Sequence, residues 1–204
     1  MDELLKGSDR RLWDLVAERA RPGADVATVD KRIWDLFGET WAVMFTDLSG
    51  FSRQVEKFGI LHFLQVIHEH KQLLSPLIAR HDGILIKIEA DSLLVIFRRT
   101  SAAVRCAVEM QTVLDEVNRT RTPETEVLLC VGIGHGEILR IGDLDVFGRE
   151  VNAASKLGED VAKAREILLT RAAVESAGVI EGLAFERIEA QVGGSSENYR
   201  VTYR

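Results

Sequence analysis

The sequence predicts an α+β domain, because strand-like and helix-like segments alternate over most of its 204 residues. Short apolar runs rich in β-branched residues at 42–48, 83–88 and 93–97 are typical of strands. Apolar residues recur at helical spacing over 60–80 and 101–114. With one further strand, the order strand–helix–helix–strand–strand–helix–strand resembles a ferredoxin-like βαββαβ core with extensions.

The C-terminal half supplies the remaining elements. A strand is expected at 127–134, and the short apolar run 138–141 suggests one more. A helix is expected over 151–163 and a strand at 167–170. The tail 185–203 predicts a final hairpin, so these elements extend the core.

The first forty residues have a different pattern, and we assign 1–40 to an N-terminal helical hairpin and 41–204 to the main domain. Ser8 can cap a first helix, which Pro22 and Gly23 would end, and Thr28 can cap a second. The hairpin contains a short repeat, DRRLWDL against DKRIWDL, whose Leu or Ile, Trp and Leu residues could form one apolar patch. The hairpin either packs on its own domain or serves as a dimerisation or signal-coupling element, and both readings stay open.

The composition excludes several classes of protein. The net charge of −6 gives no basic excess, which argues against nucleic-acid binding. The apolar runs are far shorter than the roughly 20 residues that span a bilayer. The polar, acidic opening is unlike a signal peptide. Cys106 and Cys130 lie inside apolar runs, so we expect buried free thiols and a cytoplasmic protein.

The segment FTDLSGFS places the carboxylate of Asp47 at the end of a predicted buried strand. The backbone amides of Gly50, Phe51 and Ser52 would point toward a group bound there. Amides at a helix start suit phosphate, and a carboxylate beside them suits a hard cation. A strand-ending Asp is also common as a plain helix cap, and spacing alone leaves both readings open.

A second carboxylate, Asp91, lies in the tight link between two predicted strands, four residues after Lys87. If this hairpin neighbours the strand that ends at Asp47, the two carboxylates could share metal ions. Asp is also a favoured turn residue, which gives the alternative reading.

The segment DVFGREVNAASKL, which begins at Asp145, carries an amide and an ammonium four residues apart. That spacing puts Asn152 and Lys156 on one face of a helix. An amide and an ammonium together can stabilise developing negative charge. A solvated helix surface with an incidental Lys is the alternative.

These three segments, in this order and spacing, resemble the catalytic domain of the class III adenylate and guanylate cyclases over about 41–203. The resemblance implies the class III nucleotide cyclase fold and makes 41–204 the catalytic domain. It implies a lyase of signal transduction that converts ATP to 3′,5′-cyclic AMP and pyrophosphate. It also implies a homodimer with two equivalent sites, each built from both chains.

The resemblance assigns a role to each matching residue. Asp47 and Asp91 would hold two Mg²⁺ or Mn²⁺ ions per site, and the Gly50–Ser52 loop would lie against the substrate. The partner chain would read the purine and grip the sugar and phosphate, through Lys87 and Asp145 for the base, Asn152 for the ribose and Lys156 for the α-phosphate. A Lys donor and a carboxylate acceptor suit adenine.

Three positions depart from the family pattern. Ala90 stands where Gly is usual, which restricts the turn if a positive φ is needed. Lys156 stands where Arg is usual, which keeps the charge and loses the planar fork. The segment 192–200 lacks the Lys that holds the outer phosphates, and Arg187 or Arg200 are its candidate substitutes.

Two alternative functions stay open: a guanylate cyclase, and a catalytically weak or inactive pseudo-cyclase that acts as a dimeric nucleotide-binding or regulatory module. The presence of both Asp47 and Asp91 favours an active enzyme, because two converging carboxylates repel each other without a cation. The sequence identifies no regulatory partner.

Overall fold

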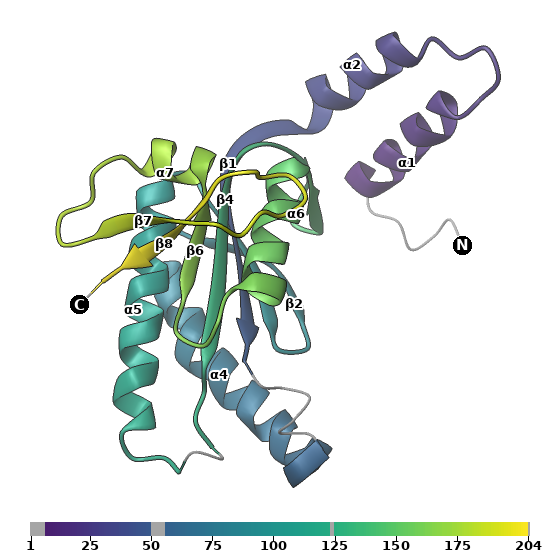
Figure 1. Ribbon diagram of the computed structural model, residues 1–204. Coiled ribbons are helices and arrows are strands. Elements are labelled where there is room, and N and C mark those ends of the chain that lie inside the picture. The colour runs from purple at the N-terminus through teal and green to yellow at the C-terminus, as the bar shows by residue number, and fades with distance from the viewer. Residues whose placement is uncertain (1–6, 50–55, 123–124, 204) are drawn as a thin grey trace.

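The computed structural model describes residues 7–49, 56–122 and 125–203 (Figure 1). The elements follow one another in the order α1 (Gly7–Arg19), α2 (Val26–Phe37), β1 (Gly38–Leu48), α4 (Ile60–Arg80), β2 (Ile84–Glu89), β3 (Ser92–Phe97), α5 (Thr100–Asn118), β4 (Leu129–Ile141), β5 (Asp145–Phe147), α6 (Arg149–Lys156), a π-helical turn (Leu157–Val161), β6 (Ile167–Thr170), α7 (Arg171–Ala177), β7 (Ala184–Ile188) and β8 (Asn198–Thr202).

The strands form one mixed sheet in the order β2-β3-β1-β4-β6-β8-β7, with β5 paired to β4. The order β2-β3-β1-β4 is that of a ferredoxin-like core in which helices follow β1 and β3. Strands β6, β8 and β7 extend the sheet beyond β4, and β4 and β6 run parallel. The predicted α+β fold with a ferredoxin-like βαββαβ core and extensions is confirmed.

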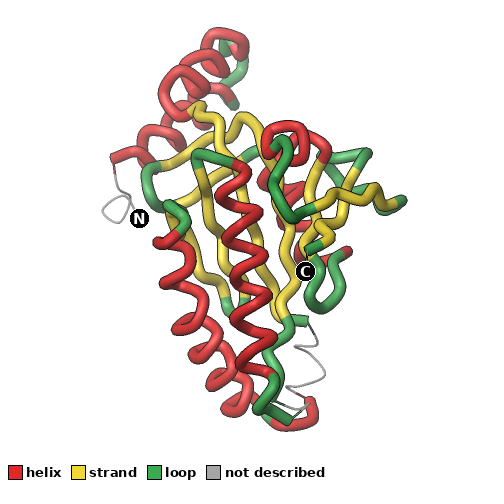
Figure 2. The backbone as a smooth tube through the Cα atoms, turned by 90° about the vertical axis from the view of Figure 1, so that its left-hand side faces the viewer, coloured by secondary structure: helices red, strands yellow, loops and turns green. Residues whose placement is uncertain are grey.

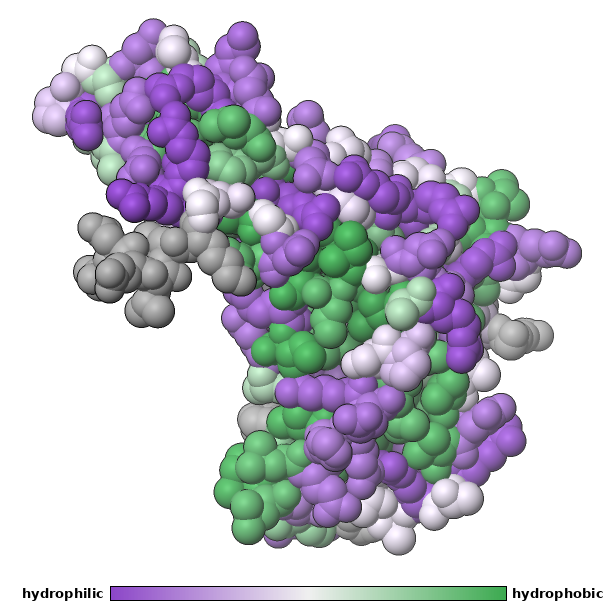
Figure 3. Space-filling view, turned by 180° about the vertical axis from the view of Figure 1, so that it is seen from behind, coloured by the Kyte–Doolittle hydropathy of each residue, from purple (hydrophilic) through white to green (hydrophobic). Residues whose placement is uncertain are grey.

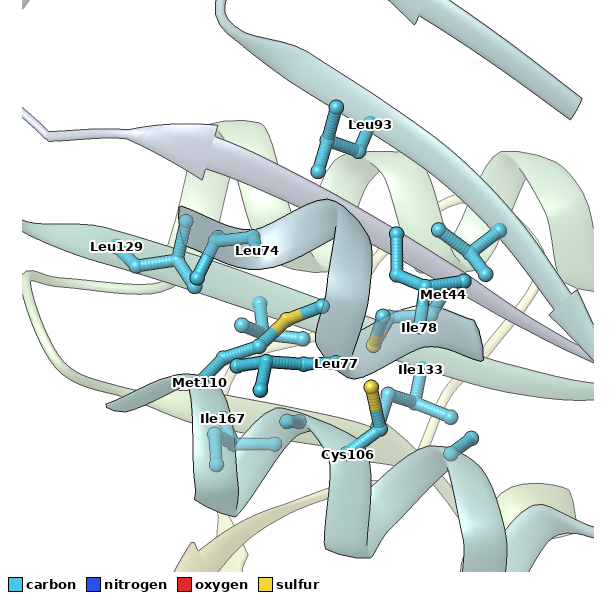
Figure 4. Close-up of a cluster of buried hydrophobic side chains, with 14 of the residues drawn as sticks. Met44, Leu74, Leu77, Ile78, Leu93, Cys106, Met110, Leu129, Ile133 and Ile167 are labelled. Atoms are coloured by element: carbon cyan, nitrogen blue, oxygen red, sulfur yellow. The ribbon is translucent and has the colours of Figure 1, made fainter. Parts of the chain in front are cut away.

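Helices α4 and α5 cover one face of the sheet (Figure 2). The main core lies between these helices and the sheet, where side chains from β1, β3, β4 and the two helices interlock (Figure 4). Met44, Leu93 and Ile133 come from the strands, and Cys106 and Met110 come from α5. Alternate residues of the same strands face the other side, where α6 covers part of the sheet.

The N-terminal helices form the expected hairpin, which projects from the end of the sheet (Figure 1). It packs on its own domain through a small apolar cluster that includes Leu12, Ile33 and Ile141 of β4. The expectation that both Trp residues join this patch is wrong, because Trp13 is 51% exposed and Trp34 is 44% exposed. The repeat therefore buries its Leu12 and Ile33 positions and leaves its Trp positions outside.

Several helix starts differ from the sequence prediction, and Ser8, which was expected to cap α1, lies within that helix. The N-cap of α2 is Asp25, whose carboxylate accepts a hydrogen bond from the Thr28 amide at 3.1 Å, so Thr28 is the capped residue rather than the cap. Helix α5 starts at Thr100 after Arg99, with no side-chain cap, and Ser101 lies within the helix.

Two other boundaries differ as well. The runs 127–134 and 138–141, which were expected to form two strands, belong to one strand of thirteen residues, β4. The helix expected over 151–163 ends at Lys156 and continues as one π-helical turn, Leu157–Val161. Strand β1 begins at Gly38, three residues before the predicted start of the main domain.

The cysteine prediction holds in the structure. Cys106 and Cys130 are free and buried, and burial raises the pKa of the Cys106 thiol to about 12 and that of Cys130 to about 11. Among the residues that the structure describes, no helix is long and apolar enough to cross a membrane.

Exposed apolar side chains gather at the N-terminal end of α4, which forms hydrophobic surface at the lower end of the domain (Figure 3). Phe58, Ile60, Leu61 and Leu64 make up this patch, and Leu61 is 79% exposed.

Candidate active site

The structure brings Asp47 and Asp91 together at one end of the sheet. Asp47 ends β1, and Asp91 lies in the turn between β2 and β3. Because β1 pairs with β3, with Thr46 opposite Leu93, the two carboxylates meet across the strand pair, close enough for Asp91 to raise the pKa of Asp47. Ser92 stands beside them and donates a hydrogen bond from Oγ to Asp47 Oδ1 at 3.4 Å.

Burial, and after it the adjacent Asp91 and the more distant Glu159, together raise the pKa of Asp47 to about 7. Among the described residues, neither carboxylate forms an ion pair with a Lys or Arg side chain, which would favour the charged form of Asp47. Carboxylate oxygens are hard ligands, which suit Mg²⁺ or Mn²⁺. The residues present therefore fit a divalent cation.

The described residues contain no group of three His, Cys, Asp or Glu side chains that could hold a metal ion by themselves. Asp47 and Asp91 would therefore supply only part of a coordination shell. Mg²⁺ commonly keeps waters and binds through one or two carboxylates plus substrate phosphates. This donor set is thus suited to a cation that arrives with a polyphosphate.

The turn that presents Asp91 requires a left-handed backbone at the preceding residue. Ala90 has φ = 48°. A Cβ makes this conformation unfavourable, whereas Gly adopts it freely. Ala at this position therefore strains the turn between β2 and β3.

Lys87 and Asp145 also meet, and the ammonium of Lys87 donates a hydrogen bond to Asp145 Oδ2 at 2.6 Å. Glu89, on the same face of β2, lies on another side of the ammonium, with Oε1 3.2 Å from Lys87 Nζ. The hydrogen bond to Asp145 raises the pKa of Lys87 above its usual value, and Glu89 raises it further. The ammonium therefore stays charged at neutral pH.

These groups border a cavity of about 120 Å³ between the sheet and α6. Its apolar walls are Phe45, Leu94, Val146 and Val151, and its polar lining is Lys87, Glu89, Ser92, Asp145 and Glu159. Flat apolar walls with polar groups at one edge suit a heterocyclic base. Ser92 lines the cavity and also contacts Asp47, so the cavity adjoins the carboxylate pair.

Asn152 and Lys156 share one face of α6, as predicted, but this face lies outside the cavity lining. Asn152 donates a hydrogen bond from Nδ2 to the carbonyl oxygen of Gly193 at 2.7 Å. Lys156 Nζ lies 3.5 Å from Asp160 Oδ2. Within one chain, α6 therefore points these two groups toward the C-terminal turn, while Val151 lines the cavity.

Five other residues were predicted to contact the substrate. Gly50, Phe51 and Ser52 lie outside the described residues. Arg187 Nε lies 3.8 Å from Glu197 Oε1, and Arg200 Nη2 lies 2.9 Å from Glu166 Oε1. Both cations thus already have carboxylate partners, and their role as phosphate ligands stays a prediction.

Sequence reasoning missed Glu89, Ser92 and Glu159 as lining residues. Strand alternation could have found the first, since residues two apart share a face and Glu89 follows Lys87 by two. Glu159 lies on the π-helical turn, which no local pattern predicted.

The model of the adenylate and guanylate cyclase catalytic domain matches residues 36–201 of this chain. The match covers most of the chain, and the fold and the neighbouring carboxylates are consistent with it. The chain belongs to this family and is a class III nucleotide cyclase domain.

Two curated proteins share segments with this chain. A serine/threonine-protein kinase, pkn2, of Myxococcus xanthus is 35% identical over 131 residues, which cover 64% of this chain and 15% of that protein. The putative adenylate cyclase 3 of Rhizobium meliloti is 31% identical over 116 residues, which cover 57% of this chain and 20% of that protein. The matched segments are thus a fifth or less of each relative's length.

Solved structures show the same fold at low identity. The adenylyl cyclase CyaB of P. aeruginosa superposes with a TM-score of 0.70 at 19% identity, over 82% of this chain and 95% of that chain. The guanylyl cyclase Cya2 superposes with a TM-score of 0.63 at 22% identity, over 80% of this chain and 90% of that chain.

Proposed function

We propose that this chain is an adenylate cyclase, which converts ATP to 3′,5′-cyclic AMP and pyrophosphate at a site shared by two copies of the chain. The observation that carries the proposal is that the fold forms both pairs, Asp47 with Asp91 and Lys87 with Asp145, so that in a dimer one copy can supply the first pair and the other copy the second. One pair suits a cation with a polyphosphate, and the other suits the edge of a purine.

The choice of ATP is supported by the polar edge of the cavity. Adenine carries an amine at its 6-position, which donates, whereas guanine carries an oxygen there, which accepts. The carboxylate of Asp145 can accept from the adenine amine, and Lys87 can donate to a ring nitrogen. The match to a putative adenylate cyclase points the same way.

Asp47 and Asp91 would hold Mg²⁺ or Mn²⁺, two ions per site in this proposal. Bound there, the metal would lower the pKa of the ribose 3′-hydroxyl and neutralise the triphosphate. The residues themselves orient the reactants. Asn152 would position the ribose, and Lys156 would stabilise charge on the α-phosphate.

A shared site is supported by the direction of α6. Asn152 and Lys156 lie outside the cavity that adjoins their own Asp47 and Asp91, so one chain does not bring these two groups to its own carboxylate pair. In a two-fold dimer, the carboxylate pair of one copy faces this helix of the other, and the symmetry gives two equivalent sites. The buried free thiols support a cytoplasmic location.

The first test is to incubate the purified protein with Mn²⁺ and either ATP or GTP, and to separate the products by chromatography. We expect cyclic AMP from ATP, little cyclic GMP, and no product from the Asp47→Ala variant. Cyclic product from that variant would refute the cation assignment. Nucleotide binding without product in the wild-type protein would support the pseudo-cyclase instead.

A mixing experiment tests the shared site. Asp47→Ala and Lys156→Ala variants should each keep about 1% of the wild-type activity or less alone, because each damages both sites of its homodimer. In a mixed dimer one site carries both lesions and the other carries none, so random mixing should restore about a quarter of the wild-type activity. No recovery, with exchange of subunits demonstrated, would contradict a site built from two chains.

A further inference from the structure

The Lys87 ammonium has one carboxylate neighbour more than the purine-reading pair requires. Lys87 and Asp145 together are neutral, and Glu89 adds a negative charge on another side of the same ammonium. Glu89 lies two residues after Lys87 on β2, and both side chains face the cavity because alternate residues of a strand share a face. The contact is therefore built into the strand.

We propose that Glu89 strengthens the preference of this site for adenine over guanine, by holding the Lys87 ammonium and by making the edge of the cavity net negative. The proposal rests on the nucleotide site proposed above. Asp47, Asp91, Asn152 and Lys156 play no part in it.

The first step of the argument concerns the ammonium. Lys87 carries three N–H donors and no acceptor. Asp145 accepts one at 2.6 Å and Glu89 lies within reach of a second at 3.2 Å, so one remains for a ligand. A ring nitrogen of adenine needs one donor. The oxygen and ring nitrogen of guanine together profit from two, and Glu89 competes for the second.

The second step concerns charge. Two carboxylates facing one ammonium leave a net charge of −1 at this edge of the cavity. The amine of adenine presents positive hydrogen atoms to that edge, whereas the 6-oxygen of guanine presents a lone pair and is repelled. Without Glu89 the edge would be neutral and would favour the amine less.

The size of the effect follows from exposure. The Glu89 side chain is 72% exposed, whereas those of Lys87 and Asp145 are 33% and 29% exposed. Water therefore screens the charge of Glu89 more than that of Asp145. An exposed charge of this kind typically changes an equilibrium by up to about fivefold, so Glu89 should adjust the preference that Asp145 establishes.

The test uses the full chain and compares Glu89→Leu and Glu89→Gln with the wild-type protein. ATP and GTP each compete with a fluorescent ribose-labelled ATP, so the ratio of their affinities is measured without turnover. Both variants should lower the ratio that favours ATP by about fivefold. The Gln variant keeps the length of the side chain and removes its charge, which separates electrostatics from packing.

The matched control is Glu186→Leu, which removes an exposed strand glutamate for which the described residues give no ion pair. It should leave the ratio unchanged. Where the wild-type protein turns over, KM for ATP should rise in the Glu89 variants with kcat unchanged, because the residue acts on base binding. Partial misfolding of a variant would lower its apparent affinities for ATP and GTP equally and would leave their ratio unchanged.

A ratio within twofold of wild type in both Glu89 variants would overturn the inference, as would an equal change in Glu186→Leu. Wild-type protein that prefers GTP, or binds neither nucleotide, would overturn it too. Wild-type protein that binds ATP over GTP but makes no cyclic product would refute the proposed catalysis alone, and the affinity ratio would still decide the role of Glu89.

Discussion

Asn152 binds the backbone of Gly193, with 2.7 Å between its Nδ2 atom and the carbonyl oxygen. The neighbouring Arg149 makes a matching contact from Nε to the carbonyl oxygen of Gly194 at 2.6 Å. Two side chains of α6 thus hold the C-terminal turn. Gly193 permits this approach, because a Cβ there would lie 3.3 Å from Asn152 Nδ2. In the proposed reaction, Asn152 would break its hydrogen bond to the Gly193 carbonyl oxygen and form one with the ribose.

We expect Asn152→Ala to lower kcat by about 100-fold, because loss of a positioned donor costs this much in comparable sites. Steady-state kinetics with ATP measure the effect. Arg149→Ala is the control, since it removes the other contact with the same turn. An equal loss in both variants would mean that the turn, rather than the amide, limits the reaction.

Ala90→Gly should stabilise the protein by about 0.5–1 kcal/mol, because relief of the left-handed strain outweighs the entropy that Gly adds to the unfolded chain. Urea denaturation measures the free energy of unfolding. Ala172→Gly in α7 is the control, where helical backbone gives Gly no advantage and a loss of about 1 kcal/mol is expected. If Ala90→Gly lowered the free energy of unfolding as Ala172→Gly does, Ala90 would be shown to be unstrained.

His70 is fully buried in α4, and neither ring nitrogen has a hydrogen-bond partner within the described structure. Burial lowers the pKa of His70 to about 4. In the unfolded chain His70 therefore binds a proton near pH 6.5, whereas in the native state it stays neutral until about pH 4. The free energy of unfolding thus falls as the pH drops from 6.5 toward 4. Between pH 7 and pH 5 the loss should be about 2 kcal/mol.

The variant His70→Leu should remove this loss and raise stability at pH 7 by about 1 kcal/mol, because Leu leaves no buried polar atom unpaired. Urea titrations at the two pH values measure both effects. His68→Leu, an exposed position on the same helix, should keep the wild-type pH dependence. Identical slopes for wild type and His70→Leu would place the acid sensitivity elsewhere.

The pair of Asp47 and Asp91 predicts a pH-dependent response to metal. A carboxyl whose native pKa is raised to about 7 favours the native state when protonated, and this advantage disappears as the pH rises through 7. Mn²⁺ should therefore raise the melting temperature more at pH 8 than at pH 6. Since Asp47 is only half-buried, we expect metal-free Asp47→Asn to be more stable at pH 8 by only about 1 kcal/mol.

The same variant supplies the control for this prediction. Asp47→Asn should show no pH-dependent response to Mn²⁺, whereas Asp143→Asn, an exposed loop position, should behave as wild type. A response to Mn²⁺ that is equal at both pH values would contradict competition between protons and metal at this pair.

Local patterns predicted the elements that local forces decide. Helix α4 (Ile60–Arg80) and strand β6 (Ile167–Thr170) have the predicted bounds, since one has clear helical periodicity and the other is a continuous apolar run. The nearness of Asp47 and Asp91 needed the family resemblance, because strand pairing between distant segments leaves no local signal.

The continuity of β4 shows why other features were missed. The expected break at 135–137 is continuous strand, and Gly132 and Gly134 within β4 let α6 pack closely on it. A Cβ on Gly132 would come within 2.0 Å of the Ala154 carbonyl oxygen, and one on Gly134 within 2.6 Å of that of Glu150. Glycine is needed at these positions because α6, which comes later in the chain, packs against them. Only the tertiary structure therefore explains why they are glycines.

Lys156 provides the last prediction. Its ammonium lies 3.5 Å from Asp160 Oδ2, and both side chains are exposed, so this pair contributes little to stability. Lys156→Ala should lower kcat about 100-fold with little change in KM, if the ammonium meets charge that develops only in the transition state. Lys156→Arg should raise kcat above wild type, because a planar guanidinium can donate two parallel hydrogen bonds to a phosphate.

Asp160→Asn separates the ion pair from the reaction, since it frees the ammonium without altering it. It should change kcat by less than about twofold, because an exposed pair restrains its partner weakly. If Lys156→Ala also stays within twofold, α6 does not stabilise the transition state, and the cation that does must lie elsewhere. A loss in Lys156→Ala that Lys156→Arg fails to restore would show that the site is shaped for an ammonium, so that Lys is here an adapted residue and not a weakened Arg.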